Sequence, residues 1–128
     1  MRYLILALLH MAAIFFASSL PGSEAARLVR PLGLPDYVLH GITFFGLAAL
    51  WYFALVRGFR MGEWKARWLA LGISALYGLT DEYHQSWVPG RDASATDFLA
   101  DLVGAASALL IILLFERRKG ADATPTSG

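Results

Sequence analysis

The stretch DEYHQSWVPGRDASATDFLAD, residues 81–101, places a dense set of polar side chains between two long apolar segments. Its ionisable and amide side chains are Asp81, Glu82, His84, Gln85, Arg91, Asp92, Asp97 and Asp101. Ionisable groups at the end of a membrane-spanning helix cost free energy unless they face a polar cavity, pair with one another or reach the headgroup region. The stretch therefore predicts the ends of two helices and a candidate site between them.

The composition lies outside the usual balance of soluble domains. Of the 128 residues, 57% are hydrophobic and 16% are charged, whereas soluble domains carry about 25% charged residues. The absence of cysteine excludes a disulfide scaffold and a thiolate zinc site. A net charge of +1 does not indicate nucleic acid as a partner. An integral membrane protein is therefore the first hypothesis.

Four apolar runs predict four transmembrane helices. They cover residues 3–20, 37–56, 68–87 and 98–115, and the third of them ends in polar residues. The first run has eighteen residues, and as a helix it would extend about 27 Å, close to the thickness of the hydrocarbon core. A cleaved signal peptide is the alternative for this run, because Arg2 precedes it and the small residues of SEAA, 23–26, follow it.

The expected fold is an all-α polytopic membrane protein. Its four transmembrane helices would form one domain over residues 1–119, followed by a disordered polar tail over 120–128. The linker 21–36 contains three prolines, so it cannot run as one helix and has room only for short helical turns.

Loop charges orient the four helices. With the N-terminus in the cytoplasm, eight basic residues lie on the inner side (Arg2, Arg57, Arg60, Lys65, Arg67, Arg117, Arg118 and Lys119) and three on the outer side (Arg27, Arg30 and Arg91). The positive-inside rule then places both termini in the cytoplasm, in a multi-pass protein of the cytoplasmic membrane. The stretch 81–101 would lie on the extracytoplasmic side, together with His40 at the start of the second run.

Local patterns predict the helix starts and the turn beside this stretch. Asp36 follows Pro35 at the head of the second run, where a carboxylate can accept an unpaired backbone N–H. Ser94 is followed three residues later by Asp97, a variant of the capping box, so the last helix is expected to begin near Ser94. In the turn VPGR, 88–91, proline fixes φ and glycine allows positive φ, which would aim Arg91 back over the polar stretch.

Helical spacing predicts which polar side chains share a face. Asp81, His84 and Gln85 are spaced i, i+3 and i+4, whereas Glu82 is turned by about 100° from Asp81. We expect His84 to form a hydrogen bond with a carboxylate, because neither group is stable unpaired near lipid.

The last helix carries a second acidic face. Asp97 and Asp101 are spaced i and i+4, and the same stripe continues through Gly104 to small residues. Small residues allow close helix packing in membranes. We therefore expect the stripe to press onto the preceding helix over 68–87.

Several of these features occur together: DExHQ at 81–85, the turn PGR at 89–91, Asp97 with Asp101 and Gly104, the pair Asp36 and His40, and Ser18-x-x-Pro21. With this combination the chain resembles the VanZ-like family of small integral membrane proteins. The resemblance implies a bacterial cell-envelope protein related to one that gives low-level resistance to the glycopeptide antibiotic teicoplanin. Two positions depart from the family pattern, since Tyr37 stands where lysine is common and Asp101 where asparagine is frequent.

The first functional hypothesis is a membrane-embedded enzyme that acts at the outer leaflet on a lipid or lipid-linked envelope headgroup. The candidate catalytic residues are His40, Asp81, Glu82 and His84, the candidate substrate-binding residues are Gln85 and Arg91, and the supporting or metal-binding candidates are Asp97 and Asp101. His84 or Glu82 would be the general acid or base. A divalent cation is a candidate cofactor: an oxygen-rich site favours Mg²⁺ or Mn²⁺, and two histidines would favour Zn²⁺.

Other interpretations of the same residues stay open. The polar groups can form a buried network that only ties the last two helices together. They can also bind an envelope component or an antibiotic without turnover. A proton-coupled carrier is a further alternative, although four helices are few for alternating access unless the protein forms a homo-oligomer.

Overall fold

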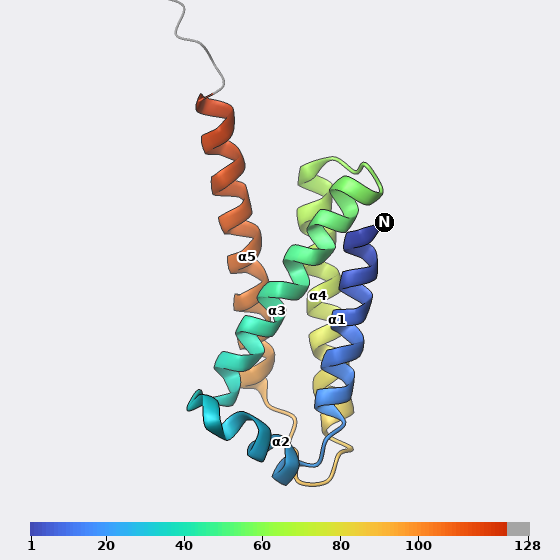
Figure 1. Ribbon diagram of the computed structural model, residues 1–128, viewed down its shortest axis with the longest axis vertical. Helices are drawn as coiled ribbons and strands as arrows, with labels where there is room; N and C mark the ends of the chain where they lie inside the picture. The colour runs from blue at the N-terminus through green and yellow to red at the C-terminus, as the bar shows by residue number, and fades with distance from the viewer. Residues whose placement is uncertain (123–128) are drawn as a thin grey trace, which may run out of the picture.

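Four long helices run side by side in the computed structural model, which describes residues 1–122 (Figure 1). The elements are α1 (Arg2–Ser18), α2 (Gly22–Val29), the 3₁₀-helix η1 (Arg30–Leu32), α3 (Asp36–Phe53), the π-helix η2 (Ala54–Gly58), α4 (Glu63–Gln85) and α5 (Ala95–Asp122). The described residues form no strand, so the predicted all-α class is confirmed. Helix α5 extends through Asp122, past the start of the predicted tail at 120, and the rest of that tail, 123–128, lies outside the described residues.

Two helices are long and apolar enough to cross a membrane, namely α3 continued by η2 (Asp36–Gly58) and α5 (Ala95–Ala121). A third crossing is added if α1 and the segment Gly22–Leu32, which bend by 117° relative to each other, form one broken span. Among the described residues, α4 is not one of these candidate membrane spans, since it carries charges near both ends. The fold is thus that of a membrane protein with two to three candidate spans, and a crossing by α4 stays a prediction.

The short helices lie across the end of the bundle that also holds the turn between α4 and α5 (Figure 1). Pro21 has an extended conformation just before α2, and Gly33 ends η1 with a φ of 63°. These breaks agree with the prediction of short helical turns between prolines. Both described ends of the chain lie at the opposite end of the bundle.

The core is built on a face of α4 made of small residues. Ala66, Ala70, Ser74 and Gly78 recur every four residues and are all buried. Residues four apart lie on one side of a helix, so this stripe lets the neighbouring helices approach closely. Aromatic side chains fill the space beside it, and Tyr52 and Phe44 of α3 are almost fully buried.

The close contact of α5 differs from the predicted one. A Cβ atom on Gly104 would lie 2.0 Å from the carbonyl oxygen of Gly41, which belongs to α3. Gly104 therefore packs against α3 rather than α4. The contact with α4 is made one turn earlier, where a Cβ atom on Gly78 would lie 2.9 Å from Asp101 Oδ2.

We expect Gly104→Ala to lower the melting temperature of the purified protein by several degrees. The added methyl group would collide with the backbone of Gly41, and overpacking of this kind costs about 1–3 kcal/mol. Gly72→Ala is the matched control, because no atom of the part of the chain that the structure describes lies within 4 Å of a Cβ at that helical position. Equal melting temperatures for the two variants in detergent would contradict the tight crossing of α3 and α5.

Candidate functional site

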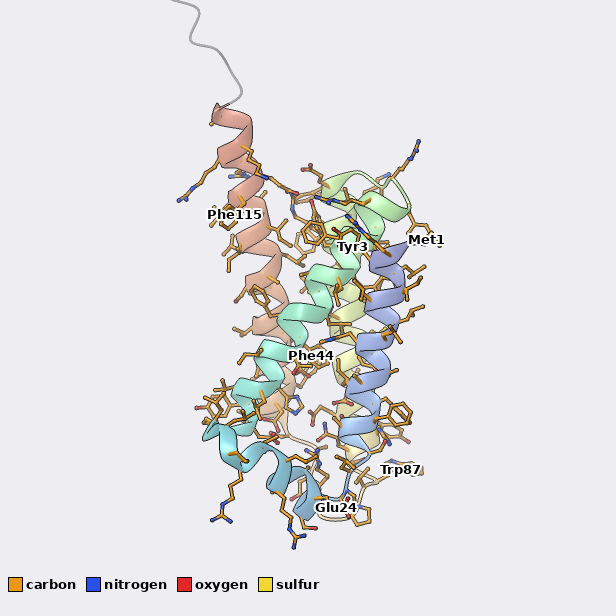
Figure 2. The ribbon with its side chains drawn as sticks, in the orientation of Figure 1. Met1, Tyr3, Glu24, Phe44, Trp87 and Phe115 are labelled. Atoms are coloured by element: carbon orange, nitrogen blue, oxygen red, sulfur yellow. The ribbon has the colours of Figure 1, made fainter. Side chains whose placement is uncertain are left out.

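The candidate site lies where the start of α3, the end of α4 and the start of α5 meet. Both predicted helix starts are confirmed: Pro35 has an extended conformation and Asp36 opens α3, while Ser94 Oγ accepts a hydrogen bond from Asp97 N–H at 3.2 Å. Figure 2 shows polar side chains between the helices at this end, with the labelled Phe44 nearer the middle of the bundle.

One buried cluster joins the three long helices. His40 Nδ1 donates a hydrogen bond to Asp101 Oδ1 at 3.0 Å and lies 3.9 Å from Glu82 Oε1. Glu82 is 6% exposed and Asp101 is 1% exposed. We call His40, Glu82 and Asp101 the inner triad.

Each acid of the inner triad has one oxygen with a partner and one without. Glu82 Oε2 accepts a hydrogen bond from Ser94 N–H at 2.7 Å. Glu82 Oε1 and Asp101 Oδ2, by contrast, are buried and have no hydrogen-bond partner among the described residues. A buried polar group left unpaired costs about 1–3 kcal/mol, and more when it is charged. The two free oxygens therefore suit a cluster that receives a ligand or a proton.

A second group of acids surrounds the same histidine on its more exposed side. Asp36, His40 and Asp97 each offer one ligand atom, and these atoms lie within 4.8 Å of one another. We call Asp36, His40 and Asp97 the outer group. The two acids that lie four residues apart on α5 therefore belong to different groups, Asp101 to the inner triad and Asp97 to the outer group. His40 belongs to both groups and is the centre of the site.

The shared face of Asp81 and Gln85 is confirmed. Gln85 Nε2 donates to Asp81 Oδ2 at 2.8 Å and lies 3.5 Å from Ser18 Oγ on α1. This face of α4 points toward α1, whereas Glu82, one residue along, points toward α3 and α5. Asp81 and Glu82 are thus rotated from each other as predicted. Asp81 lies on the side of α4 that faces α1, and Glu82 belongs to the inner triad.

The prediction for His84 is wrong. Its ring stacks on Phe15 of α1, with ring centroids 4.6 Å apart, and its buried Nδ1 has no hydrogen-bond partner among the described residues. His84 shares the Asp81 face as expected, but that face meets an aromatic side chain, and Gln85 bonds the Asp81 carboxylate. The histidine that bonds a carboxylate is His40.

Arg91 follows the predicted turn, in which Gly90 has a φ of 72°. Its Nη2 donates to the carbonyl oxygen of Ala17 at 3.2 Å, and its Nη1 lies 3.8 Å from Asp36 Oδ2. The side chain therefore lies over the end of α1 and beside the outer group of acids.

A cavity of about 250 Å³ lies beside the inner triad, which lines it through His40. Its polar lining includes Asp36, His40, Asp81, Gln85 and Arg91, and apolar residues of α1 and α3 complete the wall. The cavity thus combines acids, a histidine, an amide and a guanidinium group at one end of an apolar bundle. Such a set can bind an anionic or hydroxyl-bearing headgroup and exchange protons with it.

Two contributors were missed by reasoning from the sequence. The backbone N–H of Ser94 orients Glu82, and Gly78 leaves space for the Asp101 carboxylate. Gly78 is the last member of the small-residue stripe on α4, so a search for that spacing could have identified it. The contact at Ser94 depends on the path of the chain between α4 and α5, for which local patterns hold no signal.

Comparison with known proteins yields one match. The family model described as VanZ/LLP1 matches residues 3–116, a range that contains the inner triad and all residues that line the cavity. Neither the curated proteins nor the solved structures contain a significant match to the chain. The family assignment therefore rests on a match over most of the chain.

Proposed function

The chain belongs to the VanZ/LLP1 family, and from this premise we propose that it is an integral membrane enzyme that modifies a lipid or lipid-linked headgroup of the bacterial envelope. The observation that carries the proposal is the inner triad, in which two buried carboxylates meet one histidine and each keeps an oxygen that has no hydrogen-bond partner within residues 1–122. A purely structural network would be expected to satisfy these oxygens.

The chemistry that fits the site is attack by a water molecule or hydroxyl group on an ester or phosphoester of the headgroup, in which the bond to the leaving alcohol breaks and that alcohol takes up a proton. The inner triad takes the proton of the attacking group, because Glu82 Oε1 is unpaired and His40 lies beside it. Gln85 and Arg91 line the cavity together with His40, and they suit a phosphate or carboxylate of the substrate. The apolar surface of α1, α3 and α5 would keep the acyl chains or the polyprenyl chain of the substrate in the membrane.

The proposal places the site on the outer face of the cytoplasmic membrane, with four crossings and both termini inside. Supporting it, the basic side chains of the predicted inner segments meet at one end: Arg57 donates to Tyr3 on α1, and Arg67 is paired with Glu116 on α5. Arg91 and the inner triad belong to the other end. A role in resistance to teicoplanin would follow if the modified headgroup belongs to a precursor of the cell wall.

The topology yields a direct prediction. A reporter that is active only outside the cytoplasm is expected to be silent when fused after Lys119, because eight basic residues hold that side of the protein inside. The same reporter inserted after Asp92, on the predicted outer side, is expected to be active. Activity after Lys119 would overturn the four-helix topology.

The function is tested by comparing the lipids of cells that express the wild-type chain with those of cells that express Glu82→Gln. This substitution keeps the size of the side chain and removes its charge. We expect a headgroup species to accumulate or disappear only with the wild type. Glu24→Gln is the matched control, because Glu24 is exposed on α2 and is expected to leave the lipids as the wild type does. If the wild-type and Glu82→Gln profiles agree while both proteins copurify with the same lipid, the site binds without turnover.

A further inference from the structure

We propose that the inner triad holds one divalent transition-metal ion through His40 Nδ1, Glu82 and Asp101. The inference rests on the proposed function in that it names the cofactor of the same site. His40, Glu82 and Asp101 each offer a ligand atom, and the three atoms lie within 4.8 Å of one another.

The spacing of the three residues fits a single ion. Ligands held at the usual 2.0–2.2 Å from a tetrahedral metal lie roughly 3.4 Å from each other. His40 Nδ1 lies 3.0 Å from Asp101 Oδ1 and 3.9 Å from Glu82 Oε1, on either side of that value. Small side-chain movements, together with loss of the Nδ1 proton that His40 now donates to Asp101, would therefore bring all three groups into coordination.

Two unpaired oxygens supply an independent argument. Glu82 Oε1 and Asp101 Oδ2 are buried without a hydrogen-bond partner among residues 1–122, on side chains that are more than nine-tenths buried. Two carboxylates and one imidazole at such close range need more positive charge than a single proton supplies. A divalent cation provides that charge, pairs Glu82 Oε1 directly and neutralises the Asp101 carboxylate to which Oδ2 belongs.

The mixed ligand set decides the class of ion. Carboxylate oxygens alone suit Mg²⁺, Ca²⁺ and Mn²⁺, whereas an imidazole nitrogen favours transition metals such as Zn²⁺. His84 stacks on Phe15 and does not add a second nitrogen. One nitrogen and two carboxylates therefore favour Zn²⁺ or Mn²⁺ over Mg²⁺.

The outer group gives the ion a second layer of support. Asp36 and Asp97 lie around the same imidazole, and a metal-binding histidine commonly donates its other ring N–H to a carboxylate. Three protein ligands leave a position for water, and a metal-bound water loses a proton more readily than a free one. The ion would thus activate the water that attacks the headgroup, and Asp101 Oδ2, the oxygen left out of coordination, would take the water's proton.

The test measures metal content and metal binding on purified full-length protein. We expect the wild type, stripped with a chelator and reloaded with Zn²⁺ or Mn²⁺, to retain about one ion per chain, as the stoichiometry of a three-ligand site requires. Glu82→Gln should retain only the background amount. Asp92→Asn is the matched control, because it removes an exposed acid of the same region and should retain the ion. Asp97→Asn should weaken binding by about 10–100-fold without abolishing it.

Three results would overturn the inference. The first is background metal content in the wild type, and the second is equal retention by the wild type and Glu82→Gln. The third is loss of the ion in Asp97→Asn with full retention in Glu82→Gln, which would place the ion in the outer group. A wild type that changes headgroups without any ion refutes the metal site alone, whereas an ion bound by the inner triad without any headgroup change refutes the proposed function alone.

Discussion

Replacement of His40 by asparagine is expected to reduce the rate of headgroup modification by at least about 100-fold, the usual contribution of a general acid or base. An asparagine amide can keep the hydrogen bond that His40 Nδ1 donates to Asp101. It cannot carry a proton at the same position or bind a transition metal as imidazole does. The loss should therefore appear in the rate while the purified protein keeps its melting temperature within a few degrees.

His10→Asn is the matched control for this experiment. His10 is also partly buried, and its Nε2 donates to the carbonyl oxygen of Thr43 at 3.0 Å, so it is held by the backbone of α3 and belongs to neither group of acids. We expect this variant to retain the rate of the wild type. His84→Asn distinguishes the two assignments of the catalytic histidine, because the sequence pattern predicts a loss there and the structure predicts none. Retained activity in His40→Asn together with a loss in His84→Asn would contradict the site described above.

The second large effect is expected from Asp101→Asn. The substitution keeps the shape of the side chain and removes one of two buried negative charges that meet at His40. If the inner triad holds an ion, metal retention and headgroup modification should fall together, with modification reduced by at least about 100-fold. Expression should stay near the wild-type level, because removal of a buried charge relieves its desolvation cost.

Melting temperature, metal content and lipid turnover of Asp101→Asn are measured on the same preparation. Asp92→Asn again serves as the control for loss of one acid at an exposed position. A variant that melts at a higher temperature and keeps full activity would mean that the acids form only a strained polar network. In that case both the metal ion and the catalytic role of Asp101 should be abandoned.

Features set by neighbouring residues in the chain could be predicted from the sequence. The start of α3 after Pro35, the cap at Ser94 and the positive φ of Gly90 all depend on a few adjacent residues. The bond between Gln85 and Asp81 also follows from spacing within one helix. The fold class and the set of polar residues at one end of the bundle were therefore predictable.

Contacts between helices could not be predicted in the same way. Spacing identified the face of α4 that carries His84, but it gave no information that this face meets Phe15 on α1. It likewise indicated a close packing face at Gly104 without showing that Gly41 on α3, rather than α4, lies opposite. Which helix packs against a given face depends on how the helices are arranged in space. The periodic pattern of one helix holds no information on that arrangement.

The ends of the helices could also be predicted only in part from the sequence. The last apolar run ends at 115, yet α5 continues through charged residues to Asp122. Arginine and lysine are good helix formers and are favoured near a helix C-terminus, so a loss of hydrophobicity does not mark the end of the helix. Helix α4 extends over Glu63–Gln85, beyond its apolar part, but its composition is too polar for a candidate membrane span.

The most direct test of the account is turnover by the purified protein in vesicles made from a bacterial lipid extract that includes lipid-linked cell-wall precursors. Headgroups are followed over time by mass spectrometry for the wild type, Glu82→Gln and the control Glu24→Gln. We expect one headgroup species to be converted by the wild type and by Glu24→Gln, and to stay unchanged with Glu82→Gln. Equal conversion by all three proteins, or conversion by none of them, would contradict the claim that the inner triad of His40, Glu82 and Asp101 modifies a membrane headgroup.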